Sequence, residues 1–171
     1  DKSMERILHH ASKHGLKRIV ETGCIRAEED WRGAGFATYL LGAYATATGG
    51  HLDSVDLSES NCRFAAKWTR VFGSSVDIHC RDSVEYLSNR QEPVDVLYLD
   101  SWDTTHPGYA EHGLREVEAG SHLLHDLSLV VFDDTSLQGG RWKGKGMLGV
   151  PWMLERGWRT LHVGHQTVLI R

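Results

Sequence analysis

The sequence is short of the residues that mark several protein classes. Only three cysteines occur among its 171 residues, and they form no C-x-x-C pair, so neither a disulfide framework nor a structural zinc site is expected. Nineteen basic residues stand against 23 acidic ones, for a net charge of −4, which leaves no positive excess to grip a phosphate backbone. We therefore expect reduced thiols, a cytoplasmic location and no nucleic-acid partner.

Long apolar runs, linkers and repeats are scarce as well. No run approaches the roughly 20 apolar residues of a membrane span, and the chain does not begin with the apolar stretch of a secretory signal. Three prolines interrupt the sequence, and no Ser/Gly-rich linker divides it. We expect a single domain over residues 1–171 and no membrane partner.

Short β-branched runs alternate with longer helical patterns. Strands are predicted at residues 18–20, 52–57, 76–78, 94–99 and 127–132, and helices at residues 34–48, 59–72, 83–89, 108–124 and 147–156. This alternation is typical of a parallel sheet with helices on both faces. Two final strands, 158–163 and 166–170, are separated by a turn so short that they must be antiparallel. The prediction is an α/β fold with a doubly wound, mostly parallel sheet.

Acidic residues recur where the predicted strands end. They are Glu21, Asp56, Asp82, Asp100 and the pair Asp133-Asp134. A single such carboxylate is more often a turn former or a helix cap than a ligand. However, ligands of doubly wound sheets bind beyond the carboxyl ends of the strands. Acids at five ends therefore favour a binding site there.

A glycine-bearing turn follows the first predicted strand. Glu21-Thr22-Gly23 leads to Gly33-Ala34-Gly35 and a long apolar helix, a pattern shared by dinucleotide sites, phosphate loops and plain tight turns. No Gly-Lys-Ser/Thr follows, which excludes a P-loop. Asp56 stands where an acidic residue accepts hydrogen bonds from ribose hydroxyls, and this favours a nucleoside ligand.

Taken together, these features resemble the class I S-adenosylmethionine-dependent methyltransferases over nearly the whole chain. The resemblance implies a Rossmann-like seven-stranded sheet with an antiparallel C-terminal strand and S-adenosyl-L-methionine as cofactor. It also implies that Gly23 and Gly35 face the methionine portion, Asp56 the ribose, and Asp82 with Ser83 the adenine. The expected cofactor-binding set is completed by Glu21, Asp100 and Trp102. The turn is longer than in the family, and its acidic insert, residues 27–31, is expected to form a lid or a solvated loop.

A narrower resemblance concerns the fourth and fifth predicted strands. The segment Leu99-Asp100-Ser101-Trp102-Asp103 and the pair Asp133-Asp134 resemble the metal-binding segments of catechol O-methyltransferase-like enzymes. The resemblance implies that Asp100, Asp133 and Asp134 hold Mg²⁺ or Mn²⁺, for which hard oxygen donors are suited. The lysine base of those enzymes is replaced by Asp103, so Asp103 and His106 become the candidate bases, although a polar loop position next to Pro107 is the favoured explanation of His106.

Other residues receive less specific predictions. Residues 138–146 are expected to form a flexible basic segment, in which Arg141 or Lys145 pairs with an anionic substrate unless the segment is a solvated loop. Aromatic stacking on the ligand is expected from tryptophans in loops, namely Trp31, Trp102 and Trp142. Surface or capping positions are expected for three histidines, His112, His122 and His125.

The function expected from these features is metal-assisted O-methylation of a small molecule. The alternative is a nucleotide- or NAD-binding Rossmann-like module without transferase activity, which predicts neither the Asp133-Asp134 pair nor an antiparallel last strand. A carboxylate-rich metal-binding protein would leave Asp56 and Asp82 unexplained. The chain leaves little room for a cap domain, so the acceptor is expected to be held by loops or by a second subunit of a homo-oligomer.

Overall fold

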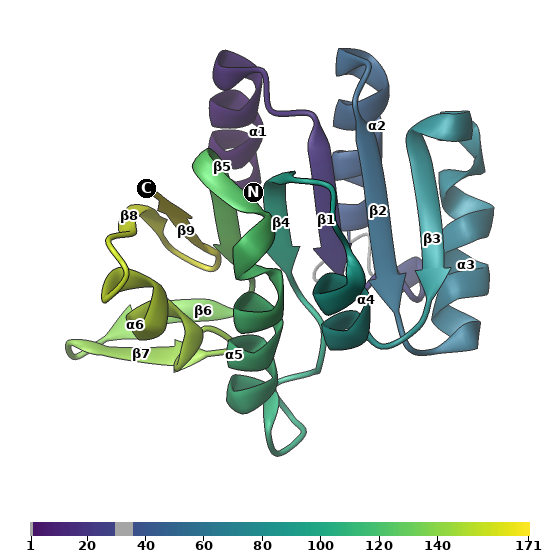
Figure 1. Ribbon diagram of the computed structural model, residues 1–171. Helices are drawn as coiled ribbons and strands as arrows, with labels where there is room; N and C mark the ends of the chain where they lie inside the picture. Colours follow the sequence, from purple (N-terminus) through teal and green to yellow (C-terminus); the bar gives the residue numbers. More distant parts are fainter. Residues whose placement is uncertain (1, 30–35) are drawn as a thin grey trace.

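The computed structural model describes residues 2–29 and 36–171 (Figure 1). In this part of the chain seven strands form one sheet in the order β3-β2-β1-β4-β5-β9-β8. Its strands are β1 (Arg18–Thr22), β2 (His51–Asp56), β3 (Val76–Cys80), β4 (Val94–Leu99), β5 (Leu124–Phe132), β8 (Arg159–Val163) and β9 (Thr167–Ile170). Strands β1 to β5 pair in parallel, and β9 lies antiparallel to both β5 and β8. The predicted mostly parallel, seven-stranded α/β sheet with an antiparallel last strand is confirmed.

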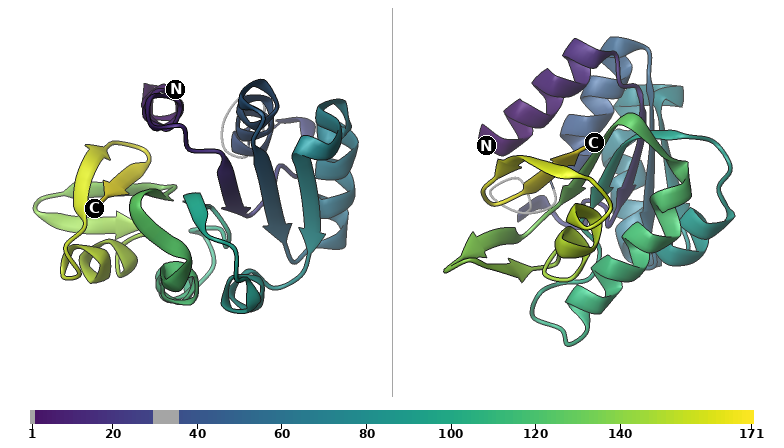
Figure 2. Two further views of the ribbon diagram at one scale, coloured as in Figure 1. Left: turned by 45° about the horizontal axis from the view of Figure 1, so that its top comes forward. Right: turned by 60° about the vertical axis from the view of Figure 1, so that its left-hand side comes forward.

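Helices cover both faces of the sheet (Figure 2). One face carries α1 (Lys2–His14), α2 (Ala37–Thr48) and α3 (Glu59–Thr69), which the 3₁₀ helix η2 (Arg70–Ser75) follows. The other face carries α4 (Ser83–Asn89), α5 (Tyr109–Gly120), the 3₁₀ helix η3 (Ser121–Leu123) and α6 (Gly149–Leu154). Among the described residues, no helix combines the length and hydropathy that a membrane span requires.

The central strand β4 shows why both faces must be covered. All six of its residues are buried, and residues 96–99 alternate between two apolar cores. Val96 and Tyr98 pack into the core beneath α1 and α2, whereas Leu97 and Leu99 pack into the core beneath α5 and α6. A continuous apolar strand of this kind is typical of parallel sheets buried on both sides.

Residues 138–146, predicted as a flexible basic segment, belong largely to a second, two-stranded sheet. Strands β6 (Thr135–Gln138) and β7 (Arg141–Gly144) pair antiparallel and project from the end of the main sheet (Figure 1). The turn consists of Gly139 and Gly140, with φ of 55° and 74°. Positive φ at both turn positions matches the twist of hairpin strands, and glycine adopts it at little steric cost. The Gly-Gly pair therefore marks a tight turn rather than a mobile loop.

Candidate active site

Backbone hydrogen bonds continue past the strand ends and bring the following residues together. The Gly23 N–H donates to Val55 O at 2.8 Å, and the Asp100 N–H donates to Thr22 O at 2.9 Å. One strand further on, the Asp133 N–H donates to Leu99 O at 3.0 Å. The residues that end four strands thus lie side by side at one edge of the sheet, as the strand-end prediction requires.

A cavity of about 360 Å³ opens at this edge, a volume typical of small-molecule sites. Nine of the predicted site residues line it: Gly23, Asp56, Asp82, Ser83, Asp100, Trp102, Asp103, His106 and Asp134. Two others, Glu21 and Asp133, are buried behind the described part of the wall. Gly35 and Trp31 fall outside the described residues, as does the end of the acidic insert.

The backbone geometry at Gly23 shows why the turn after β1 requires a glycine. Its φ is +79°, and a Cβ atom at this position would lie 2.7 Å from the carbonyl oxygen of Asp100. Any side chain here would therefore push the end of β4 away from the end of β1. The glycine is needed for close contact between two strand ends at the cavity floor.

Asp56 is held in a fixed orientation at the end of β2. Its Oδ1 accepts a hydrogen bond from the Ser58 N–H at 2.8 Å, and its Oδ2 accepts one from the Cys24 N–H at 3.2 Å. The Asn61 side-chain amide lies 3.2 Å from both oxygens. These contacts fix the carboxylate on the wall of the cavity.

Asp82 and Ser83 join the cavity wall to the start of α4. Asp82 is the N-cap of this helix, and its Oδ1 accepts a hydrogen bond from the Glu85 N–H at 2.9 Å. Ser83 is buried at the first position of the helix. Asp82 therefore caps α4 and also lines the cavity. Its cap uses Oδ1, so Oδ2 is available to a ligand.

Glu21 lies beneath the cavity and does not line it. Its side chain is buried, and its Oε2 accepts a hydrogen bond from Ser54 Oγ at 2.5 Å. Burial raises the pKa of Glu21 to about 8, because removal from water penalises the charged form. The carboxyl group therefore acts in the sheet interior rather than on a ligand.

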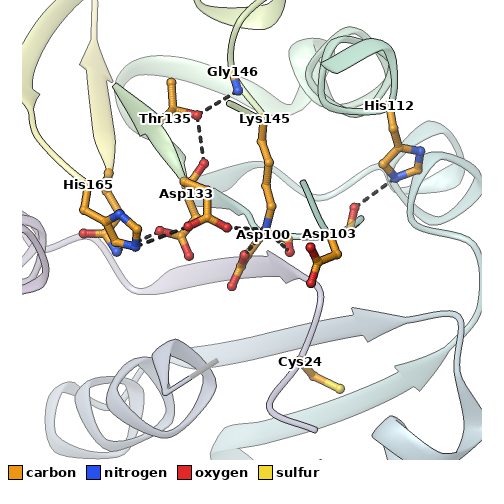
Figure 3. Close-up of polar contacts among 12 residues, drawn as sticks. Cys24, Asp100, Asp103, His112, Asp133, Thr135, Lys145, Gly146 and His165 are labelled. Atoms are coloured by element: carbon orange, nitrogen blue, oxygen red, sulfur yellow. Dashed lines mark hydrogen bonds and ion pairs between the residues drawn. The ribbon is translucent and has the colours of Figure 1, made fainter. Parts of the chain in front are cut away.

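The acidic centre at the ends of β4 and β5 contains an internal cation. Lys145, which follows β7, reaches into this centre, where its Nζ donates a hydrogen bond to Asp100 Oδ1 (Figure 3). The same Nζ donates to Asp100 O at 2.9 Å and lies 3.2 Å from Asp134 Oδ2. Burial alone lowers the pKa of Lys145, but the neighbouring carboxylates of Asp100, Asp134 and Asp133 outweigh it, so the pKa is raised.

This donor set fits a divalent ion poorly. Lys145 engages one carboxylate oxygen of Asp100 and one of Asp134, and Asp133 Oδ1 accepts a hydrogen bond from Gln166 Nε2 at 2.8 Å. Two of these residues, Asp133 and Asp134, instead group with His165, with one ligand atom from each within 4.8 Å of the others. The predicted trio of Asp100, Asp133 and Asp134 is therefore close together, and the Lys145 ammonium group already compensates part of its negative charge.

The two predicted bases differ in their surroundings. Asp103 accepts hydrogen bonds from the backbone N–H and the hydroxyl of Thr105, both at 2.9 Å, and these bonds lower its pKa. Its carboxylate also lies 3.6 Å from Arg26. His106 is exposed on the cavity wall, with Nδ1 3.3 Å from the Thr105 hydroxyl. The hydrogen bonds from Thr105 thus make Asp103 a weak proton acceptor.

His112 corrects the expectation of a surface or capping histidine. It lies on α5, is 9% exposed and lines the cavity. Its Nε2 is 2.9 Å from Ser101 Oγ and 3.2 Å from Glu116 Oε1, while Ser101 donates to Glu116 at 2.6 Å. His112 and Glu116 share one helix face because they are four residues apart. That spacing is visible in the sequence, but the approach of Ser101 depends on the tertiary fold.

Trp142 also differs from its prediction. It lies on β7, half-buried against the apolar core beneath α5 and α6. Trp102, by contrast, is 48% exposed at the cavity, with its ring centroid 4.9 Å from that of His112. Of these two tryptophans, Trp102 is the one that can stack on a ligand.

Comparison with known proteins shows a shared fold. Neither a protein-family model nor a curated protein matches the sequence. Among solved structures, an S-adenosylhomocysteine-bound methyltransferase from Podospora anserina aligns with a TM-score of 0.63 and 17% identity over 99% of this chain and 77% of that one. An S-adenosylmethionine-dependent O-methyltransferase from Thermotoga maritima aligns with a TM-score of 0.61 and 12% identity, over 99% of this chain and 64% of that one.

A 16S rRNA methyltransferase from T. thermophilus, in complex with AdoMet and guanosine, aligns with a TM-score of 0.62 and 17% identity. The alignment covers 99% of this chain and 42% of that one, so this chain spans less than half the length of that protein. At such low identities the likeness establishes the architecture. The chain has the Rossmann-like fold of S-adenosylmethionine-dependent methyltransferases.

Proposed function

We propose that the chain is an S-adenosylmethionine-dependent methyltransferase that methylates an oxygen of a small molecule. The observation that carries this proposal is the position of Asp56, fixed on the cavity wall close to the glycine turn of β1. The methyltransferase fold supports it, as does a cavity at the strand ends, where ligands of such sheets bind.

The cofactor is proposed to lie along the strand ends from β1 to β3. Asp56 accepts the ribose hydroxyls, and Asp82 with Ser83 contacts the adenine, against which Trp102 can stack. Gly23 leaves the backbone open to the methionine portion. Gly35, predicted for the same portion, lies outside the described residues.

S-adenosylmethionine supplies an electrophilic methyl group when it is bound. The protein then has to align the acceptor with that group, exclude water and remove a proton. His106 is the proposed base, because the hydrogen bonds from Thr105 lower the pKa of Asp103 and make it a weak proton acceptor. The site thus combines a positioning wall with one exposed proton acceptor.

The charge of the molecule favours a small acceptor over a nucleic acid. The net charge is −4, and the described residues that line the cavity include five aspartates, the two histidines His106 and His112, and the cations Arg26 and Lys145. Such a wall repels phosphate groups. Because one of the similar structures is an rRNA methyltransferase, nucleic acid is the competing acceptor. RNA is therefore included in the test.

The alternative of an NAD-binding module predicts a sheet without an antiparallel last strand. Strand β9 instead runs antiparallel between β5 and β8, which favours the methyltransferase. Metal assistance and a second subunit at the acceptor end remain predictions. The ion pairs of Lys145 with Asp100 and Asp134 argue against a metal ion among these carboxylates.

Calorimetry with S-adenosylhomocysteine and NAD⁺ tests the proposal. We expect the wild type to bind S-adenosylhomocysteine and not NAD⁺. Transfer of a labelled methyl group should then occur to small hydroxyl compounds and not to RNA. A folded protein that binds NAD⁺ alone, or neither ligand, would contradict the proposed function.

A further inference from the structure

Lys145 has the contacts of a built-in cation. Its side chain is 7% exposed, and its Nζ faces three oxygens: two of Asp100 and one of Asp134. An ammonium group has three N–H donors, so these contacts satisfy it fully. Burial of an ammonium group costs desolvation free energy. Close ion pairs and complete hydrogen bonding are needed to offset that cost.

The chain on either side of Lys145 fixes that geometry. At Gly144 a Cβ atom would lie only 1.6 Å from Asp134 O, so the backbone passes directly against the end of β5. The Gly146 N–H donates to Thr135 Oγ1 at 2.7 Å, and the Thr135 hydroxyl donates in turn to Asp133 O at 2.8 Å. Lys145 is therefore held between two anchored glycines, beside the two carboxylates with which it pairs.

We propose that the Lys145 ammonium takes the place of a divalent metal ion among Asp100, Asp133 and Asp134. The acceptor is then bound by hydrogen bonds to a fixed lysine–carboxylate cluster and not by chelation to an ion. Acceptors consequently need a single hydroxyl group and not two adjacent oxygens. The binding of an acceptor rests on the proposed function, whereas the replacement of the ion by Lys145 does not.

One neighbouring cluster offers the competing arrangement. His165 Nε2 lies 3.2 Å from Asp134 Oδ1, and Asp133 completes a group of three ligand atoms. His165 is 62% exposed, so an ion held there would lie outside the Lys145 contacts. Substitution of His165 separates this arrangement from the proposed one.

Titration with Mn²⁺ alone, followed by electron paramagnetic resonance, tests the proposal. The wild type should bind Mn²⁺ at this site weakly or below detection. Lys145→Met should bind it at least about tenfold more tightly than the wild type or its detection limit, because a positive charge beside the carboxylates is gone. Lys143→Met is the matched control, since Lys143 is an exposed residue of the preceding strand β7, and it should behave as the wild type. Adding Asp100→Asn to Lys145→Met should abolish the gain.

Several outcomes overturn the proposal. One is tight Mn²⁺ binding by the wild type that is lost in Asp100→Asn or in His165→Ala. Another is a folded Lys145→Met variant that gains no affinity. If Lys145→Met does not fold, Mn²⁺ or the added Asp100→Asn should restore folding in a thermal melt, and failure of both also counts against the proposal.

Calorimetry with S-adenosylhomocysteine, with and without EDTA, keeps the two proposals apart. Unchanged affinity in EDTA agrees with an ion-free site. Absence of binding in both conditions would remove the proposed function, while the Mn²⁺ titration would still decide the role of Lys145.

Discussion

Ser54 on β2 donates a hydrogen bond to the buried carboxyl group of Glu21 on β1, with 2.5 Å between the two oxygens. The two residues are direct neighbours in the parallel pairing of these strands. Burial raises the pKa of Glu21 to about 8, so the group carries its proton at neutral pH. A neutral carboxyl group at this place lets two carboxylates, Asp56 and Asp100, stand close by without a further charge beneath them.

The first prediction concerns stability against pH in Glu21→Gln. The folded pKa of Glu21 lies above its usual value of 4.5, so its contribution is complete below about pH 4.5 and is lost as pH rises towards 8. The free energy of unfolding of the wild type, relative to Glu21→Gln, should fall by up to about 1.4 kcal/mol per pH unit in this window. Urea unfolding at several pH values measures the slopes.

The control for this prediction is Glu59→Gln at an exposed position on α3. It should keep the wild-type slope. Parallel curves for the wild type and Glu21→Gln would show that Glu21 is ionised in the folded protein.

The second prediction concerns the cofactor. Asp56→Ala should weaken binding of S-adenosylhomocysteine by about 5- to 150-fold, because about 1–3 kcal/mol of charge-assisted hydrogen bonding is lost. Asp77→Ala, on the exposed side of the adjacent strand β3, should leave the affinity unchanged. Calorimetry of both variants decides, and equal affinities would remove Asp56 from the ribose site.

The third prediction compares two glycines of the hairpin. Gly139 and Gly144 both have positive φ, but a Cβ atom would meet no atom within 4 Å at Gly139 and would clash with Asp134 O at Gly144. Gly139→Ala should cost about 1 kcal/mol of stability from backbone strain alone. Gly144→Ala should cost clearly more and should displace Lys145. Denaturant unfolding measures both losses of stability. Similar losses in the two variants would count against the close approach of Gly144 to Asp134.

The fourth prediction separates the two candidate bases once an acceptor is found. His106→Gln should lower kcat by about 100-fold, the scale for loss of general base catalysis. Asp103→Asn should change kcat little, because the hydrogen bonds from Thr105 make Asp103 a weak base. The reverse order of effects would make Asp103 the base.

The periodicity of the sequence was sufficient to predict the sheet and most of the residues that line the cavity. Continuous apolar runs such as residues 94–99 predict buried parallel strands, and the short turn before residues 166–170 predicts the antiparallel last strand. Parallel strands end at one edge, so an acid after each strand predicts a shared site without knowledge of the packing. Asp56, Asp82 and Asp100 reached the cavity for this reason.

Contacts between distant segments decided the chemistry at that edge. Nothing in the glycine-rich stretch from 138 to 146 distinguishes an exposed lysine from a buried one. The hairpin pairing and the hydrogen bond of Gly146 to Thr135 place Lys145 beside Asp100. His112 and Glu116 likewise form a local pair, but only the fold brings Ser101 against them. The sequence by itself determined the sheet and the row of strand-end acids, because these follow from local periodicity. The tertiary structure decided their charge state and partners, because burial and long-range contacts set both.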